Sequence, residues 1–64
     1  MYTIKAWHPD ESVINKIKSA HYSIDEVLEV WEIGEFVVDM KNVGLNIMII
    51  DDTIFVDSRR FRQR

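Results

Sequence analysis

The stretch LNIMIIDDTIFVD, residues 45–57, decides the fold class of this chain. Apolar side chains alternate along its first half, and Asp51-Asp52 separates them from a second run rich in β-branched and aromatic residues. Two such runs on either side of a polar turn predict a β-hairpin. Because Asp-Asp lacks the glycine that tight two-residue turns favour, we expect a wider connection between the strands.

Two further strands are predicted before this hairpin. Residues 36–40 are mostly apolar and include adjacent valines, which are typical of strands. Residues 2–6 alternate between two sets of side chains, as a half-buried strand does. The run at 36–40 leads into a turn over residues 41–44, where Asn42 and Gly44 can adopt positive φ at low cost.

A first helix is predicted directly after the N-terminal strand. Pro9, Asp10 and Glu11 are typical of a first helical turn, because proline fits there and carboxylates interact favourably with the helix dipole. Apolar residues then recur at helical spacing from Val13 to His21.

A second helix is predicted over residues 24–33. Ser23 and Glu26 match the capping box of a helix N-terminus, and the apolar residues that follow recur at helical spacing, which assigns Trp31 to the core. A strand over residues 27–33 is the alternative. The helix is favoured because it separates the glutamates from the apolar residues, whereas the alternating register does not.

Together these elements predict an α+β fold with the order β-α-α-β-β-β, in which an antiparallel sheet carries two short helices on one face. Residues 1–57 are expected to form a single domain, because a chain of 64 residues is too short for more. Residues 58–64 would form an arginine-rich strand end or tail.

The composition excludes several classes of protein. The chain has no cysteine, and hence neither a disulfide nor a thiolate metal ligand. Its longest uninterrupted apolar run, residues 47–50, is far shorter than the roughly 20 residues of a membrane helix. Glycine-rich phosphate loops and the H-E-x-x-H metal pattern do not occur. We therefore expect a soluble cytoplasmic protein without membrane contact, metal site or cofactor.

The charges are distributed unevenly along the chain. The net charge is −3, but residues 1–57 hold four lysines and eleven carboxylates, whereas all four arginines lie in residues 59–64. Glutamates recur every third residue on the predicted second helix, and we expect this acidic stripe to bind a basic partner. An aromatic residue among the arginines suits phosphate contact and base stacking. The candidate partner-binding residues are Glu26, Glu29, Glu32, Glu35, Arg59, Arg60, Phe61, Arg62 and Arg64.

Part of the sequence resembles a known toxin family. The motifs that carry the resemblance are Trp7-His8-Pro9, Asn15-Lys16, the stretch HYSIDEVLEVW at residues 21–31, and Ser58-Arg59-Arg60. This pattern is similar to BrnT-type toxins of the RelE-like ribonuclease superfamily. The resemblance implies the same β-α-α-β-β-β order and an mRNA-cleaving activity, in which His21, Arg59 and Arg60 contact RNA.

Three functions are consistent with these features. The first is a small non-enzymatic protein of bacterial or phage type that binds a larger macromolecule and regulates or inhibits it. The favoured partner is a protein. This function is favoured because residues 1–57 are acidic and contain no recognisable set of catalytic residues. The alternative is a BrnT-like mRNA-cleaving toxin of a toxin–antitoxin pair, or a degenerate relative. The third is a nucleic-acid-binding module that uses the C-terminal arginines. Whether the chain forms a homodimer stays open.

Overall fold

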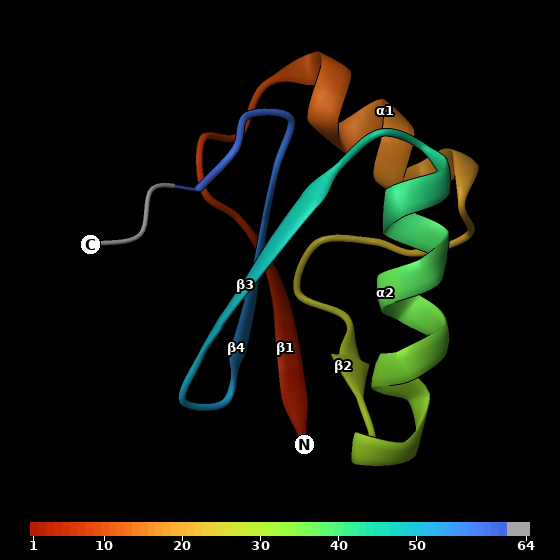
Figure 1. The fold of residues 1–64 in the computed structure, drawn as a ribbon, viewed down its shortest axis with the longest axis vertical. Helices are drawn as coiled ribbons and strands as arrows, with labels where there is room; N and C mark the ends of the chain where they lie inside the picture. The colour runs from red at the N-terminus through yellow and green to blue at the C-terminus, as the bar shows by residue number, and fades with distance from the viewer. Residues whose placement is uncertain (62–64) are drawn as a thin grey trace.

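The computed structural model describes residues 1–61 of the chain. Within them, a mixed four-stranded sheet carries two α-helices, so the predicted α+β class is confirmed (Figure 1). No helix in this part of the chain is both long and apolar enough to cross a membrane. In chain order the elements are β1 (Tyr2–Ala6), α1 (Glu11–Ser19), β2 (Val27–Leu28), the 3₁₀ helix η1 (Val30–Glu32), α2 (Ile33–Asn42), β3 (Asn46–Ile50) and β4 (Thr53–Asp57).

The strands are arranged in the order β2-β1-β4-β3, and the central pair β1 and β4 is parallel. The amide of Thr3 donates to the carbonyl of Asp52 at 3.0 Å, and the amide of Trp7 donates to the carbonyl of Val56 at 2.9 Å. The prediction of an all-antiparallel sheet is therefore wrong. Hairpin patterns report only strands that are neighbours in sequence, whereas β4 pairs with the N-terminal strand.

The hairpin of β3 and β4 is present, and its connection is tighter than expected. Ile50 and Thr53 are paired across the strands, so only Asp51-Asp52 lies between them. Asp51 has a φ of 54°, the positive value that short hairpin turns require at this position. Aspartate tolerates this conformation better than most residues, which explains how the turn closes without glycine.

The predicted helix over residues 24–33 is wrong, because the backbone here pairs with β1 instead of with itself. The amide of Asp25 donates to the carbonyl of Ile4 at 2.8 Å, and the amide of Ile4 donates to the carbonyl of Glu26 at 3.0 Å. The Glu26 carboxylate does accept from the Ser23 amide at 3.0 Å, as a capping box requires. However, Asp25 has a φ of 71°, so these contacts close a turn, and the chain continues into β2 instead of a helix.

The predicted strand at residues 36–40 is wrong as well, since these residues belong to α2. Phe36 and Met40 lie one helical turn apart and are both fully buried. The run therefore had a helical period, which the adjacent valines obscured because β-branched residues are typical of strands. Gly44, with a φ of 83°, follows α2 in the predicted turn and leads into β3.

The predicted N-terminal strand and first helix are confirmed as β1 and α1. Asp10 is the N-cap of α1, and its carboxylate accepts a hydrogen bond from the amide of Val13 at 2.9 Å. Lys16 and Lys18 lie in the last turn, where cations interact favourably with the helix dipole.

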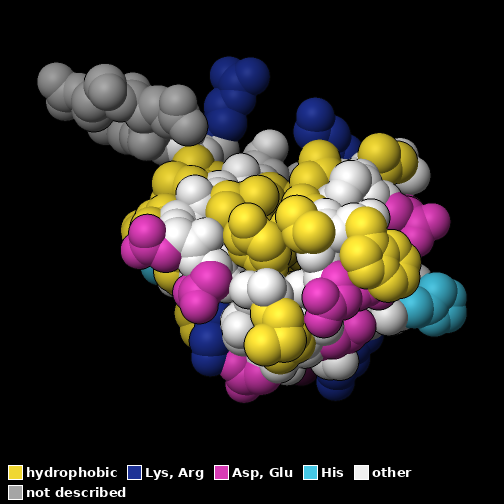
Figure 2. Space-filling view, turned by 90° about the horizontal axis from the view of Figure 1, so that it is seen from below, with side chains coloured by type: hydrophobic (Ala, Val, Ile, Leu, Met, Phe, Trp, Pro, Cys, Tyr) yellow, Lys and Arg dark blue, Asp and Glu magenta, His cyan; other side chains and the backbone are white. Residues whose placement is uncertain are grey.

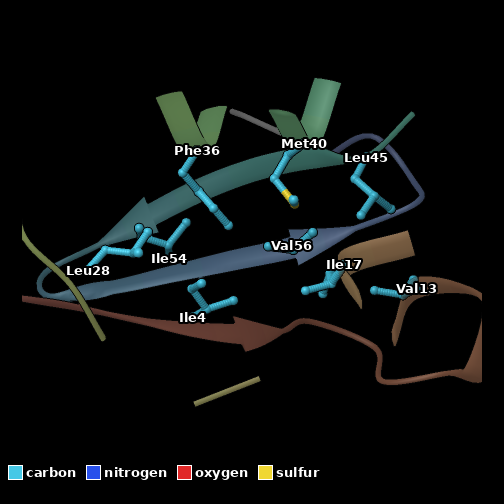
Figure 3. Packing of buried hydrophobic residues seen from close by; sticks show 9 residues of the cluster. All are labelled: Ile4, Val13, Ile17, Leu28, Phe36, Met40, Leu45, Ile54 and Val56. Atoms are coloured by element: carbon cyan, nitrogen blue, oxygen red, sulfur yellow. The ribbon is translucent and has the colours of Figure 1, made fainter. Parts of the chain in front are cut away.

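The hydrophobic core lies between one face of the sheet and the helices α1 and α2. In Figure 3, Phe36 and Met40 point from α2 toward the sheet. On β4, Ile54 and Val56 are buried beside them, and they share their face of the sheet with Ile4 of β1. The buried hydrophobic residues are Ile4, Val13, Ile17, Leu28, Phe36, Met40, Leu45, Ile54 and Val56. Because α1 and α2 cover one face, the opposite face of the sheet is left for other contacts.

Candidate partner-binding surface

The most exposed tryptophan of the described chain lies in η1. Trp31 is 78% exposed and its neighbour Val30 is 67% exposed. The prediction that Trp31 belongs to the core is therefore wrong, because it assumed a helix that started at residue 24. An indole in solvent costs free energy in the isolated protein and is typical of residues that become buried in a complex.

The turn that carries Trp31 is held by hydrogen bonds between its two flanking glutamates. The carboxylate of Glu32 accepts from the backbone amide of Glu29 at 2.8 Å. The amide of Glu32 in turn donates to the carbonyl of Glu29 at 2.9 Å. These contacts fix the backbone on both sides of the indole and place a carboxylate next to it.

This turn belongs to one end of the molecule. The chain start, η1 and the β3–β4 turn all lie at the lower end in Figure 1. Seen from below in Figure 2, hydrophobic side chains gather across this end, with acidic side chains between and beside them. The exposed hydrophobic residues of these elements are Met1, Val30, Trp31, Ile49 and Ile50. We call Val30 and Trp31, together with Glu29 and Glu32, the η1 surface.

The four glutamates of the predicted acidic stripe do not share a helix. Glu26 precedes β2, Glu29 and Glu32 flank the exposed pair of η1, and Glu35 lies in the first turn of α2. Glu29 and Glu35 are exposed. The predicted stripe is thus divided, and its middle part contributes to the η1 surface.

The helix-free face of the sheet carries an aromatic cluster. Trp7 packs edge-on against Phe55 of β4, with ring centroids 5.1 Å apart, and against Phe61 at 5.8 Å. The side-chain amide of Asn46 donates to the carbonyl of Arg59 at 3.1 Å, which holds the segment after β4 over this face. The C-terminal residues up to Phe61 therefore pack on the domain.

A concavity of about 370 Å³ lies beside the aromatic cluster, and Arg59, Arg60 and His8 line it. Asp57 also lines it and is only 3% exposed. One oxygen of Asp57 accepts from the Ser58 amide at 2.8 Å, and the other lies 3.4 Å from Nδ1 of His8. The arginines thus share a site with a buried carboxylate and a histidine.

The histidine beside the arginines is therefore His8, to which no pattern in the sequence points. His21, the residue that the family resemblance implies, is exposed in the turn after α1, with a φ of 70°. Its spacing matched a helix, but the chain leaves the helical conformation before it. Arg62 and Arg64 lie outside the described residues.

Tyr22 links the loop after α1 to α2 through a hydrogen bond and an aromatic contact. Its hydroxyl donates to Oδ2 of Asp39 at 3.0 Å, and its ring packs edge-on against Phe36, with centroids 4.8 Å apart. Burial, together with this hydrogen bond and the neighbouring carboxylates, raises the pKa of Tyr22 to about 12. The contact connects the loop after α1 to α2 and is structural.

The comparisons with known proteins do not assign this chain to a family. No family model, curated protein or solved structure matches it. The BrnT-like resemblance thus stays a prediction.

Proposed function

We propose that this chain is a non-enzymatic protein that binds a larger protein partner through the η1 surface and thereby regulates or inhibits it. The observation that carries the proposal is the exposure of Trp31 in a turn fixed by Glu29 and Glu32. Because the turn is held before binding, little conformational entropy would be lost on forming the complex.

The chemistry of the η1 surface indicates what kind of partner fits. Val30 and Trp31 require an apolar pocket, and the glutamates beside them require basic residues around that pocket. A nucleic acid is disfavoured at this surface, because its phosphates would meet carboxylates. The partner is therefore expected to present an apolar depression with lysines or arginines at its rim.

Capture of the partner by the immobilised full chain tests the proposal. We expect one protein to be retained at low salt, and Trp31→Ala to reduce its affinity by about 30-fold, the effect of losing roughly 2 kcal/mol at a central tryptophan. Val27→Ala, which truncates a half-exposed residue of β2, is the matched control and should bind like the wild type. Equal retention by Trp31→Ala and the wild type would refute the proposal.

The helix-free face favours a second candidate function, nucleic-acid binding. Trp7 and Phe61 provide aromatic rings beside Arg59 and Arg60, and proteins that bind single strands combine stacking with cationic contacts in this way. This candidate includes the BrnT-like ribonuclease. It predicts RNA affinity that falls steeply with salt and is lost in the double variant Arg59→Ala/Arg60→Ala, and growth arrest on expression if the chain cleaves mRNA.

A further inference from the structure

β3 is an edge strand of the sheet, and no other strand of residues 1–61 pairs with its outer side. The strand order places β4 on one side of it, and no described strand lies on the other. Its sequence, Asn-Ile-Met-Ile-Ile, contains neither a charged residue nor proline, the devices by which natural edge strands avoid pairing. The opposite edge, β2, is only two residues long. Any pairing of this sheet with another strand would therefore take place at β3.

The hydrogen bonds of β4 show which groups of β3 are free. The carbonyls of Asp52 and Val56 accept hydrogen bonds from β1. The backbone groups of a strand alternate in direction, so the residues of β4 that direct theirs toward β3 are Thr53, Phe55 and Asp57. Their partners across the hairpin are Asn46, Met48 and Ile50. It follows that the backbone amides and carbonyls of Ile47 and Ile49 point away from the sheet.

A groove of about 550 Å³ runs beside this edge. Val37 and Lys41 of α2 line it on one side, residues 46–49 of β3 line it on another, and Arg60 lines it as well. Ile49 is 45% exposed in the groove. The groove therefore offers free backbone groups, an apolar wall and two cations.

We propose that a second copy of this chain adds its own β3 to this edge, antiparallel and centred on Met48. In this register Ile47 of each copy lies opposite Ile49 of the other, and both residues direct their free backbone groups outward. The segment is thus complementary to itself about a two-fold axis, as a symmetric dimer interface must be. The two sheets then form one continuous sheet.

The charges at the ends of β3 favour a second copy over other occupants. In this register the turn Asp51-Asp52 of one copy extends past the strand to the beginning of β3 in the other. Lys41 lies in the last turn of α2, shortly before β3 begins, and Arg60 follows Arg59, whose carbonyl accepts from Asn46 at the start of β3. Both cations line the groove and are there to meet the carboxylates. A second copy of this chain therefore supplies both a strand that can pair with β3 and an acidic turn that can contact the two cations of the groove.

Sedimentation equilibrium of the purified full chain tests the dimer. We expect the wild type to form dimers within the range of protein concentrations that extends to about 1 mM. Ile49→Lys should lower the association constant at least tenfold. Val27→Lys places the same charge on the opposite edge strand and should associate like the wild type. Ile49→Pro is a second variant, because the amide it removes makes no bond within the sheet. It should be folded by circular dichroism and monomeric by sedimentation.

The charge contacts are tested by reversal. Lys41→Asp and Asp52→Lys should each weaken association, and the double variant should restore part of it, as coupled residues do in a double-mutant cycle. A wild-type chain that stays monomeric over the whole concentration range would overturn the proposal. So would a dimer that Ile49→Lys leaves unchanged.

Discussion

The carboxylate of Glu32 accepts a hydrogen bond from the amide of Glu29 at 2.8 Å, and the turn that they close holds Trp31 in solvent. A flexible loop would have to be ordered when a partner binds. Here the order is present beforehand, which links the local structure of η1 to the proposed binding function.

Removing the Glu32 carboxylate should loosen this turn. We expect Glu32→Ala to lower the free energy of unfolding by about 1 kcal/mol, the usual effect of losing a capping side chain. Glu32→Gln keeps an acceptor oxygen at the same position and should unfold like the wild type. Urea denaturation measures both variants, and a glutamine variant as unstable as the alanine variant would show that the hydrogen bond is unimportant.

The carboxylates around Trp31 should govern the rate of encounter with a basic partner. We expect Glu29→Lys and Glu35→Lys to slow association several-fold at low salt, with the difference shrinking as salt screens the charges. Glu11→Lys makes the same reversal at the start of α1, away from the η1 surface, and is the control. Stopped-flow or surface-binding kinetics measure the association rate constants. Equal association rates for all three variants would contradict the account.

The stability of the fold should decrease at high pH because of Tyr22. The pKa of its hydroxyl is about 12 in the folded protein and 10.0 in the unfolded reference. The unfolded chain therefore ionises first, and the contribution of Tyr22, complete below pH 10, is lost progressively between pH 10 and 12. Tyr22→Phe cannot ionise at this position, so the free energy of unfolding of the wild type, measured relative to this variant, should fall as the pH rises from 10 to 12. A relative stability that does not change over this range would contradict the account.

The core should depend on α2 as strongly as on the sheet. Phe36 is fully buried between Tyr22 and the strands, so Phe36→Ala should lower the free energy of unfolding by about 3–5 kcal/mol. Val38→Ala removes a more exposed side chain of the same helix and should cost less than about 1 kcal/mol. Similar costs for both variants would mean that α2 does not pack as described.

The sequence was sufficient for the elements whose residue pattern and turn chemistry favour one structure. β1, α1 and the β3–β4 hairpin follow from period and turn chemistry, and they occur where these patterns place them. The part from residue 23 to residue 42 could not be predicted in this way. The Ser23–Glu26 contact forms as a capping box predicts, but Asp25 adopts a positive φ and its amide pairs with β1, a strand distant in sequence.

The candidate site was predictable in composition but not in arrangement. The glutamates were selected for their charge, and Glu29 and Glu32 do lie beside the exposed indole. Trp31 itself was assigned to the core, because burial depends on where the helix begins and this depends on the pairing of β2. The position of His8 beside Arg59 likewise follows from the parallel pairing of β1 with β4.

Photo-cross-linking from position 31 tests the central claim most directly. A photoreactive phenylalanine analogue replaces Trp31 in the full chain, and in a matched variant it replaces Trp7 on the helix-free face. The account predicts that irradiation in the producing cells links position 31 to one larger protein, with little product from position 7. A cross-link to RNA from position 7, with none to a protein from position 31, would contradict it and favour nucleic-acid binding.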